Sequence, residues 1–127
     1  MRIFGIGVDV VEIVRIAHSI DQHGAPFLRR VFTDAEQHYC GAMKHPPQFY
    51  AARFAAKEAV SKAFGTGIGA SVGWLDIEVA RKPSGEPFVI LHGAGAKLAK
   101  RLGIREVLLS LSHSEHYAVA NAVAIAS

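Results

Sequence analysis

Charged side chains recur at helical spacing in the middle of the chain, where Arg53, Lys57 and Ser61 form one row and Glu58 and Lys62 lie in the next. Three cations therefore surround one carboxylate. One interpretation is a solvated helix face, on which Glu58 and Lys62 form an ordinary ion pair that contributes about 0.3 to 0.5 kcal/mol. The other is a phosphate site, in which the cations offset phosphate charge while Glu58 holds a divalent metal ion or accepts a proton. Periodicity alone favours the solvated face.

A second acidic side chain, Asp9, interrupts the otherwise apolar segment of residues 4–11. An acid among apolar neighbours needs a partner. Asp9 is either the N-cap of a following helix or an oxygen ligand that joins Glu58 around Mg²⁺, an ion commonly held by one or two carboxylates together with substrate phosphates. Gly5 and Gly7 would permit a close backbone approach beside it.

Two further segments could contact an anion. The glycine-rich loop 65–69 could present backbone N–H groups to a pyrophosphate, but it follows the C-terminal end of a helix, where the dipole disfavours anions, so Lys62 would have to hold the charge. In the segment 112–116, which reads Ser-His-Ser-Glu-His, a zinc site is disfavoured because no third soft ligand lies at a recognised spacing. His113 at such a turn can instead donate an N–H to a phosphate oxygen.

The elements that must position these side chains follow from hydrophobic periodicity and from capping and turn residues. We expect strands over residues 1–10, 74–80, 88–92, 106–112 and 117–126, and helices over residues 11–23, 34–43, 48–64 and 93–103. The 48–64 helix follows Pro46-Pro47, and the strands 74–80 and 88–92 pair as a hairpin. The pattern predicts an α+β fold with a largely antiparallel sheet packed against one long helix, in a single domain over residues 1–127.

Composition narrows the class of protein. Half of the 127 residues are hydrophobic and a fifth are charged, which excludes a disordered chain. The single cysteine, Cys40, has no partner, which excludes a disulfide scaffold and favours a reducing compartment, hence the cytoplasm. We find neither a targeting segment nor a stretch that could span a membrane. The net charge of +3 favours acidic partners.

Two alternatives to catalysis remain. A nucleic-acid-binding module would explain the basic residues, but the net charge is small and no recognition motif is present. A non-catalytic coenzyme A or nucleotide-binding protein would keep the cations without needing both Asp9 and Glu58. The presence of both carboxylates favours an enzyme.

Three ordered motifs, spread over nearly the whole chain, resemble those of one family. They are Gly-Ile-Gly-Val-Asp at 5–9 with Val-Glu-Ile at 11–13, the helical run 53–67 (Arg-Phe-Ala-Ala-Lys-Glu-Ala-Val-Ser-Lys-Ala-Phe-Gly-Thr-Gly), and Leu-Ser-His-Ser at 111–114. In these the chain is similar to the holo-[acyl-carrier-protein] synthases, small bacterial 4'-phosphopantetheinyl transferases. The resemblance implies transfer of phosphopantetheine from coenzyme A to a serine of apo acyl carrier protein in fatty acid biosynthesis, with release of adenosine 3',5'-bisphosphate.

The resemblance also assigns roles. It implies that Asp9 and Glu58 bind Mg²⁺, that Glu58 is the base for the acceptor serine, and that Lys62 acts on the leaving phosphate oxygen. It further implies that the 3'-phosphate, the adenine and the rest of coenzyme A are contacted by residues from four segments: Lys44, His45, Arg53, Ser61, Lys62, Gly65, Ser84, Pro87, His113 and Ser114.

Two expectations concern protein partners. Members of the family resemble one another in forming homotrimers with active sites at subunit interfaces, and the apolar strands 107–111 and 119–125 are compatible with such an interface. Arg15 matches the basic helix surface that docks acyl carrier protein, although the match is partial because His18, Asp21 and Gln22 follow.

Overall fold

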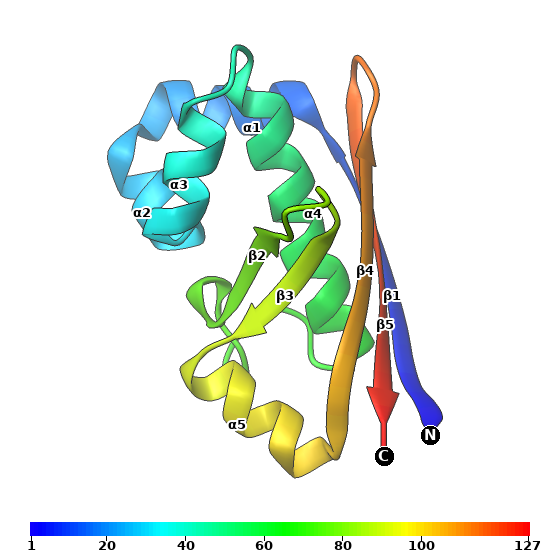
Figure 1. The fold of residues 1–127 in the computed structure, drawn as a ribbon. Coiled ribbons are helices and arrows are strands. Elements are labelled where there is room, and N and C mark those ends of the chain that lie inside the picture. Colours follow the sequence, from blue (N-terminus) through cyan, green and yellow to red (C-terminus); the bar gives the residue numbers. More distant parts are fainter.

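A three-stranded antiparallel sheet forms one side of the molecule in the computed structural model, which describes residues 1–127 (Figure 1). Its order is β1 (Arg2–Glu12), β5 (Tyr117–Ala126) and β4 (Ile104–His113). The chain's two ends therefore enter neighbouring strands, with Gly7 opposite Ala122 and Asp9 opposite Ala120. Asp9 is therefore held within the sheet, on β1 and opposite β5.

The long helix α4 (Pro46–Ala63) lies across one face of this sheet. Small side chains allow the contact, because five alanines of β5 and six of α4 are almost completely buried: Ala118, Ala120, Ala122, Ala124, Ala126, Ala51, Ala52, Ala55, Ala56, Ala59 and Ala63. On its other sides α4 meets α1, α3 and β2. A helix enclosed in this way is the centre of the hydrophobic core.

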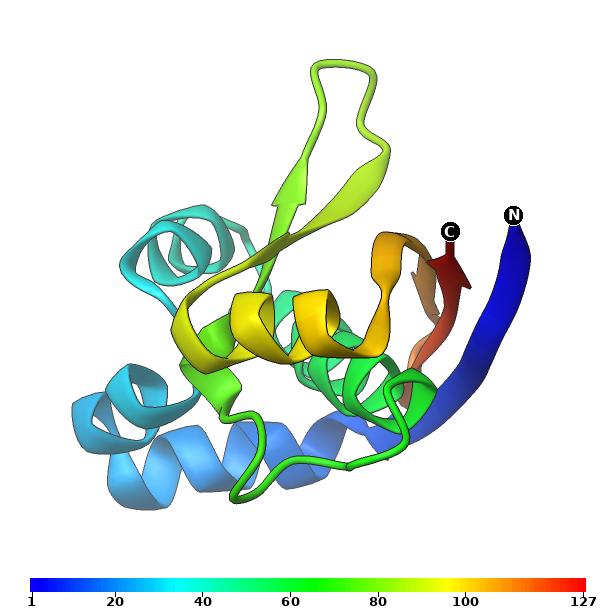
Figure 2. The ribbon, with the colours of Figure 1, turned by 90° about the horizontal axis from the view of Figure 1, so that it is seen from below.

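Three short helices and a hairpin cover the side of α4 that faces away from the sheet (Figure 2). The helices are α1 (Ile13–His23), α2 (Ala25–Val31) and α3 (Asp34–Gly41), and the hairpin consists of β2 (Ile77–Arg81) and β3 (Pro87–Leu91). A 3₁₀ turn, η1 (Trp74–Asp76), precedes β2, and α5 (Gly93–Leu102) joins β3 to β4. The predicted capping box of α3 is confirmed, since Thr33 Oγ1 accepts from the Glu36 N–H at 3.2 Å.

The predicted α+β class is confirmed, although the strands form two antiparallel sheets instead of one. One helix was missed: α2 begins directly after α1 because Gly24, at φ 58°, turns the chain and Pro26 starts a new helix. The strand expected from residue 74 begins only at Ile77, since the Asp76 carboxylate accepts from the Gly73 N–H at 2.7 Å and closes a turn. No helix has the length and apolar character needed to cross a bilayer.

The N-cap interpretation of Asp9 is wrong. Strand β1 runs on to Glu12, and α1 starts at Ile13 with no side chain capping it. Asp9 therefore lies within a strand, three residues from its end, where its partners come from another element.

Candidate active site

Asp9 meets Lys62 at the edge between β1 and α4. Their ion pair measures 3.1 Å from Oδ1 to Nζ, and the same ammonium donates to the Val8 carbonyl oxygen at 3.2 Å. The Asp9 side chain is largely buried, while about half of the Lys62 side chain is exposed. Residues 53 positions apart in sequence thus form one polar cluster.

Two glycines make this cluster possible. A Cβ on Gly7 would lie 1.9 Å from the Ala59 carbonyl oxygen, and one on Gly5 would lie 2.3 Å from the Ala63 carbonyl oxygen. Only glycine lets β1 approach α4 so closely at these two positions. The close approach predicted for this motif is made to the backbone of α4, and it brings Asp9 against the end of the helix that carries Glu58.

Glu58 completes the acidic cluster of Asp9, Glu58 and Lys62. Burial raises the pKa of its carboxyl group, the Asp9 carboxylate raises it further, and the Lys62 ammonium opposes both effects. The predicted Glu58–Lys62 ion pair is wrong, because Lys62 pairs with Asp9 instead. Two adjacent carboxylates repel, so the arrangement favours a bound cation or a shared proton.

The donor set of this cluster suits a hard divalent cation. Carboxylate oxygens are the ligands that Mg²⁺ prefers, and Mg²⁺ takes its remaining positions from water and substrate phosphates. No three His, Cys, Asp or Glu side chains converge anywhere in the chain. An ion bound by Asp9 and Glu58 would therefore need further ligands from a substrate.

The row of α4 formed by Arg53, Lys57 and Ser61 is buried, so the interpretation of this row as a solvated helix face is wrong. Lys57 is fully buried and pairs with Glu36 at 2.8 Å, and its ammonium also donates to the carbonyl oxygens of Trp74 and Ile77 at 2.9 and 2.6 Å. All three ammonium donors are used within the protein, so Lys57 cannot neutralise a phosphate. Ser61 is also fully buried and donates to the Glu58 carbonyl oxygen at 2.7 Å.

Arg53, the third member of that row, belongs to a second cluster. Its side chain is 1% exposed, yet its Nε and Nη1 atoms have no hydrogen-bond partner. A buried guanidinium with free donors is costly unless an anion satisfies it. Beside it lies a cavity of about 250 Å³ that is lined by Phe49, Ala52, Arg53, Arg81, Leu111, Ser112 and His113.

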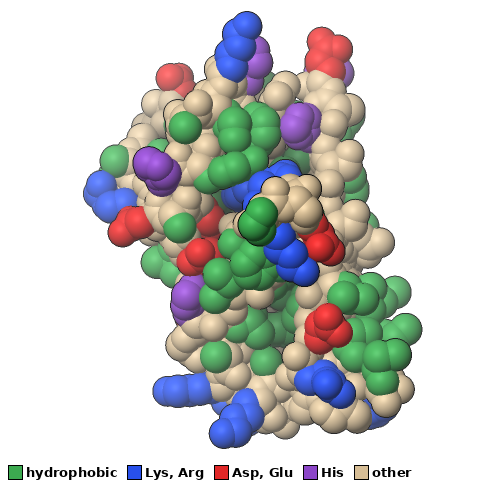
Figure 3. Space-filling view, in the orientation of Figure 1, with side chains coloured by type: hydrophobic (Ala, Val, Ile, Leu, Met, Phe, Trp, Pro, Cys, Tyr) green, Lys and Arg blue, Asp and Glu red, His purple; other side chains and the backbone are tan.

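Arg81 is a residue that the sequence did not single out. It ends β2, and its guanidinium donates to the Gly85 carbonyl oxygen across the hairpin turn. Basic side chains gather near the middle of this face of the molecule, over the hairpin (Figure 3). A lone arginine before a polar turn resembles any surface residue, so only the fold reveals that it shares a cavity with Arg53.

The remaining predicted ligand contacts fall around this second cluster or at the surface. Lys44 and His45 are exposed ahead of α4, Ser84 is exposed in the hairpin turn, and Ser114 is exposed beyond β4. Gly65 is exposed after α4. The edge of His113 meets the ring of Phe49, with centroids 5.4 Å apart.

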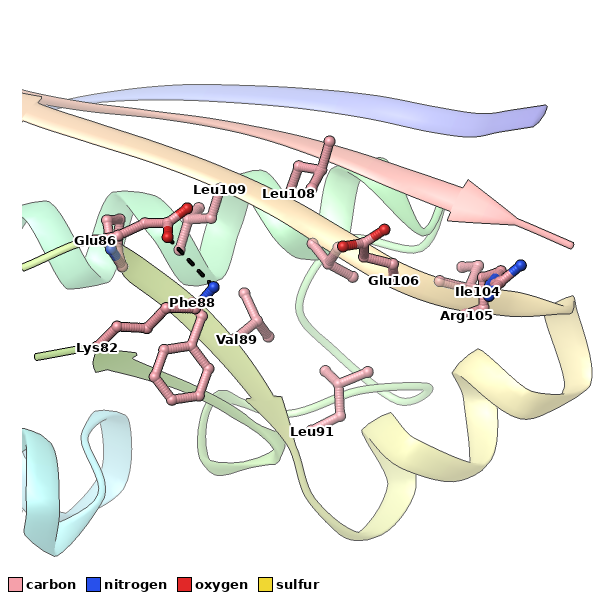
Figure 4. A pocket seen from close by; sticks show the side chains of 12 residues that line it. Lys82, Glu86, Phe88, Val89, Leu91, Ile104, Arg105, Glu106, Leu108 and Leu109 are labelled. Carbon is pink, nitrogen blue, oxygen red and sulfur yellow. Dashed lines mark ion pairs between the residues drawn. The ribbon is translucent and has the colours of Figure 1, made fainter. Parts of the chain in front are cut away.

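A larger cavity, of about 500 Å³, separates β3 from β4 (Figure 4). Apolar side chains such as Val89, Leu91 and Leu109 line it, and the Lys82–Glu86 ion pair of 3.3 Å closes one end. Pro87 is the only predicted ligand contact among its lining residues. Its two glutamates, Glu86 and Glu106, are exposed, Glu86 already pairs with Lys82, and no unpartnered buried cation lines it, so it does not resemble either polar cluster.

The predicted residues thus divide into two clusters on different faces of α4. Arg53 and Glu58 are five positions apart, which corresponds to a rotation of about 140° around a helix axis. One cluster offers carboxylates and a half-exposed cation, and the other offers guanidinium donors without partners. Together they could act on a substrate that carries both a pyrophosphate and a separate phosphate.

Comparison with known proteins identifies the family of this chain. Residues 5–122 match the sequence model of the 4'-phosphopantetheinyl transferase superfamily. A holo-[acyl-carrier-protein] synthase from Koribacter versatilis is 49% identical over 121 residues, which are 95% of this chain and 97% of the relative.

Solved structures of such synthases have the same fold. The enzyme from Neisseria meningitidis superimposes with a TM-score of 0.92 at 35% identity, covering 98% of this chain and 99% of its own. The enzyme from Bacillus anthracis, solved in complex with CoA (3',5'-ADP), superimposes with a TM-score of 0.82 at 40% identity and covers 98% of each chain.

Proposed function

The chain belongs to the 4'-phosphopantetheinyl transferase superfamily, and from this premise we propose roles for its two polar clusters in the reaction of a holo-[acyl-carrier-protein] synthase. That reaction moves 4'-phosphopantetheine from coenzyme A to a serine of apo acyl carrier protein. The observation that supports the assignment best is the convergence of Asp9, Glu58 and Lys62 where β1 meets α4. The whole of residues 1–127 acts as one transferase domain in this proposal.

Glu58 is the proposed base. The serine hydroxyl oxygen attacks the phosphorus next to pantetheine, and its proton passes to the Glu58 carboxylate. The bond from that phosphorus to the bridging oxygen breaks, and adenosine 3',5'-bisphosphate leaves with the electron pair. The raised pKa of Glu58 makes its carboxylate a better proton acceptor than an exposed glutamate.

Lys62 and Asp9 support this step. The Lys62 ammonium, half exposed and held at 3.1 Å from Asp9, can turn to the leaving oxygen and offset its negative charge. Asp9 and Glu58 would hold Mg²⁺, which supplies charge neutralisation to the pyrophosphate when bound. Gly5 and Gly7 keep β1 near enough to α4 for both carboxylates to serve one ion.

The second cluster anchors coenzyme A in this proposal. Arg53, two of whose donors have no partner, lines a cavity shared with Arg81 and His113, which suits the doubly charged 3'-phosphate. Lys44 and His45 approach from the segment before α4, and the turn from Ser84 to Pro87 would line the adenine. Ser61, Gly65 and Ser114 stay predicted contacts.

A shared active site explains why the two clusters face different ways. If one chain supplies Glu58 and its neighbour supplies Arg53, a single coenzyme A can reach both. The sheet offers a surface for such an assembly, since Ile6, Val8 and Val10 point away from α4 and are 69%, 55% and 60% exposed. By register, Leu108 and Val119 extend this apolar face on β4 and β5. We propose that it is covered in a homotrimer.

The trimer proposal is tested with two inactive variants. Glu58→Gln and Arg53→Met are each expected to lose transfer as homogeneous proteins. Mixed by unfolding and refolding together, they are expected to regain part of the parental activity, because some interfaces then combine an intact Glu58 with an intact Arg53. A mixture with no more activity than the separate variants refutes shared sites. Light scattering gives the assembly state directly, and Val8→Glu is expected to lower it.

Docking of the carrier protein is assigned to α1. Arg15 is exposed beside a small cavity of about 150 Å³ lined by Ile16, Phe27 and Phe54. A cation next to an apolar depression suits an acidic partner. Action in fatty acid biosynthesis and a cytoplasmic location stay predictions, the latter supported by the reduced, buried thiol of Cys40.

The transfer reaction itself is tested by intact-mass spectrometry of apo acyl carrier protein incubated with this protein, coenzyme A and Mg²⁺. We expect an increase of one phosphopantetheine arm that disappears with chelator. The Glu58→Gln variant is expected to be folded and inactive, and turnover within about tenfold of the parent, a barrier change near 1.4 kcal/mol, refutes its role. Coenzyme A binding without any mass increase would favour a binding protein.

A further inference from the structure

Two arginines that line the Arg53 cavity share a single aromatic ring. The Cζ atom of Arg53 lies 4.3 Å from the centroid of the Tyr39 ring, and that of Arg81 lies 5.7 Å from it. Neither arginine forms an ion pair with a carboxylate. Two like charges therefore contact one electron-rich ring and have no counter-ion, and Arg81 is also held by its hydrogen bond to the Gly85 carbonyl oxygen.

Tyr39 is itself held in place from two directions. Its ring packs edge-on against Phe49, with centroids 6.2 Å apart, and Phe49 packs against His113 on the far side. Its helix, α3, is clamped to α4 by the buried Glu36–Lys57 pair, three residues before Tyr39. The ring thus contacts both arginines, and its position is also supported by Phe49 and by the pairing of α3 with α4.

The hydroxyl group of Tyr39 makes no hydrogen bond in the structure, whereas that of Tyr50 does. The ring face is therefore the part of Tyr39 that matters at this cavity. Without it, the exposed Arg81 guanidinium would keep only its hydrogen bond to the Gly85 carbonyl oxygen and would lose the ring on which Arg53 also packs.

We propose that Tyr39 is a positioning residue that makes the enzyme selective for coenzyme A over 3'-dephospho-coenzyme A. The proposal rests on the function proposed above, in which the Arg53 cavity receives the 3'-phosphate. A doubly charged phosphate monoester satisfies the free Arg53 donors and offsets the repulsion between the two guanidinium groups. A 3'-hydroxyl does neither, so the benefit of holding both arginines exists only for the phosphorylated substrate.

The test measures kcat/KM for both substrates with the parent, Tyr39→Phe and Tyr39→Leu. The phenylalanine variant keeps the ring and is expected to match the parent. The leucine variant is expected to lower kcat/KM for coenzyme A by about tenfold, equivalent to ~1.4 kcal/mol, while leaving the value for 3'-dephospho-coenzyme A within about twofold. The selectivity ratio therefore falls, which a general loss of structure would not produce.

A second variant covers the case in which leucine disturbs the fold. Replacement of Tyr39 by 3,4,5-trifluorophenylalanine keeps the ring and its size but removes most of the negative charge from its face, so the selectivity ratio is expected to fall here too. If both variants keep the parental ratio, the role of Tyr39 is overturned while the 3'-phosphate site stands. If the parent itself does not distinguish the two substrates, the 3'-phosphate site falls and the role of Tyr39 falls with it.

Discussion

Replacing Gly7 by alanine should separate the two halves of the acidic cluster. The new Cβ would lie 1.9 Å from the Ala59 carbonyl oxygen, 2.8 Å from the Ala63 nitrogen and 2.9 Å from the Ala59 carbonyl carbon. All three atoms belong to the backbone of α4, so no side chain can turn away to make room. Strand β1 must move outward as a whole or bend.

The size of that movement follows from the contact. Cβ atoms essentially never approach another heavy atom closer than 3.0 Å, so β1 must shift by about 1 Å or more at this point. Asp9 is two residues further along the same face of the strand, and its 3.1 Å ion pair with Lys62 would lengthen to about 4 Å, beyond hydrogen-bond distance. Overpacking of this kind costs about 1 to 3 kcal/mol of unfolding free energy. A misplacement of about 1 Å in a catalytic group can lower turnover about a hundredfold.

Two assays and one matched control separate these effects. Urea denaturation gives the unfolding free energy, and carrier-protein modification followed by mass spectrometry gives turnover. Gly41→Ala is the control, because its Cβ would meet only the Tyr50 hydroxyl oxygen at 3.8 Å, and α3 should gain stability by up to about 1 kcal/mol. If Gly7→Ala unfolds at the parental urea concentration and keeps turnover within about twofold, then β1 does not hold Asp9 by close contact with α4.

Three further expectations concern the core and the docking surface. Lys57→Met leaves the buried Glu36 carboxylate without a cation and should lower the unfolding free energy by about 3 to 5 kcal/mol. Adding Glu36→Gln should restore part of this loss. Equal losses in the single and double variants would contradict the pairing. Burial raises the pKa of Cys40 from 9.0 to about 11, so the unfolded chain loses the thiol proton first as pH rises. Stability relative to Cys40→Ala should accordingly fall by ~1.4 kcal/mol per pH unit between these values, and a difference that is constant from pH 8 to pH 10 would argue against the shift. Arg15→Glu should raise the KM for carrier protein several-fold and leave coenzyme A binding unchanged, as steady-state kinetics with each substrate varied in turn would show.

Local sequence was enough to predict most elements because their signals are short-range. Pro46 and Pro47 before an apolar stripe mark the start of α4, and Thr33 with Glu36 marks the start of α3. The errors occur where a local signal was absent or ambiguous. A single glycine at position 24 ended one helix as expected, but nothing nearby distinguished the short helix that follows from a loop.

The candidate site was harder to predict, because the burial and the partners of two lysines on α4 depend on residues far away in the sequence. Lys57 and Lys62 look alike in the sequence, since each lies four residues from another polar side chain. Lys57 is buried because Glu36 of α3 and the carbonyl oxygens of Trp74 and Ile77 accept hydrogen bonds from all three of its N–H groups. Lys62 stays about half exposed because only Asp9 and the Val8 carbonyl oxygen of β1 bond to it. Periodicity along one helix cannot reveal which of its neighbours will bring an acid.

Helix α4 therefore contributes to two separate clusters, each positioned by the elements that enclose it. Lys57 pairs with Glu36 of α3 and with the carbonyl oxygen of Ile77 in β2, which places α3, and with it the Tyr39 ring that contacts Arg53 and Arg81, on one side of α4. The glycines of β1 fix Asp9 beside Glu58 on the other side. Because both clusters lie along α4, their spacing is set within each chain, and in the homotrimer proposed above the packing of neighbouring chains would bring one cluster from each to one substrate.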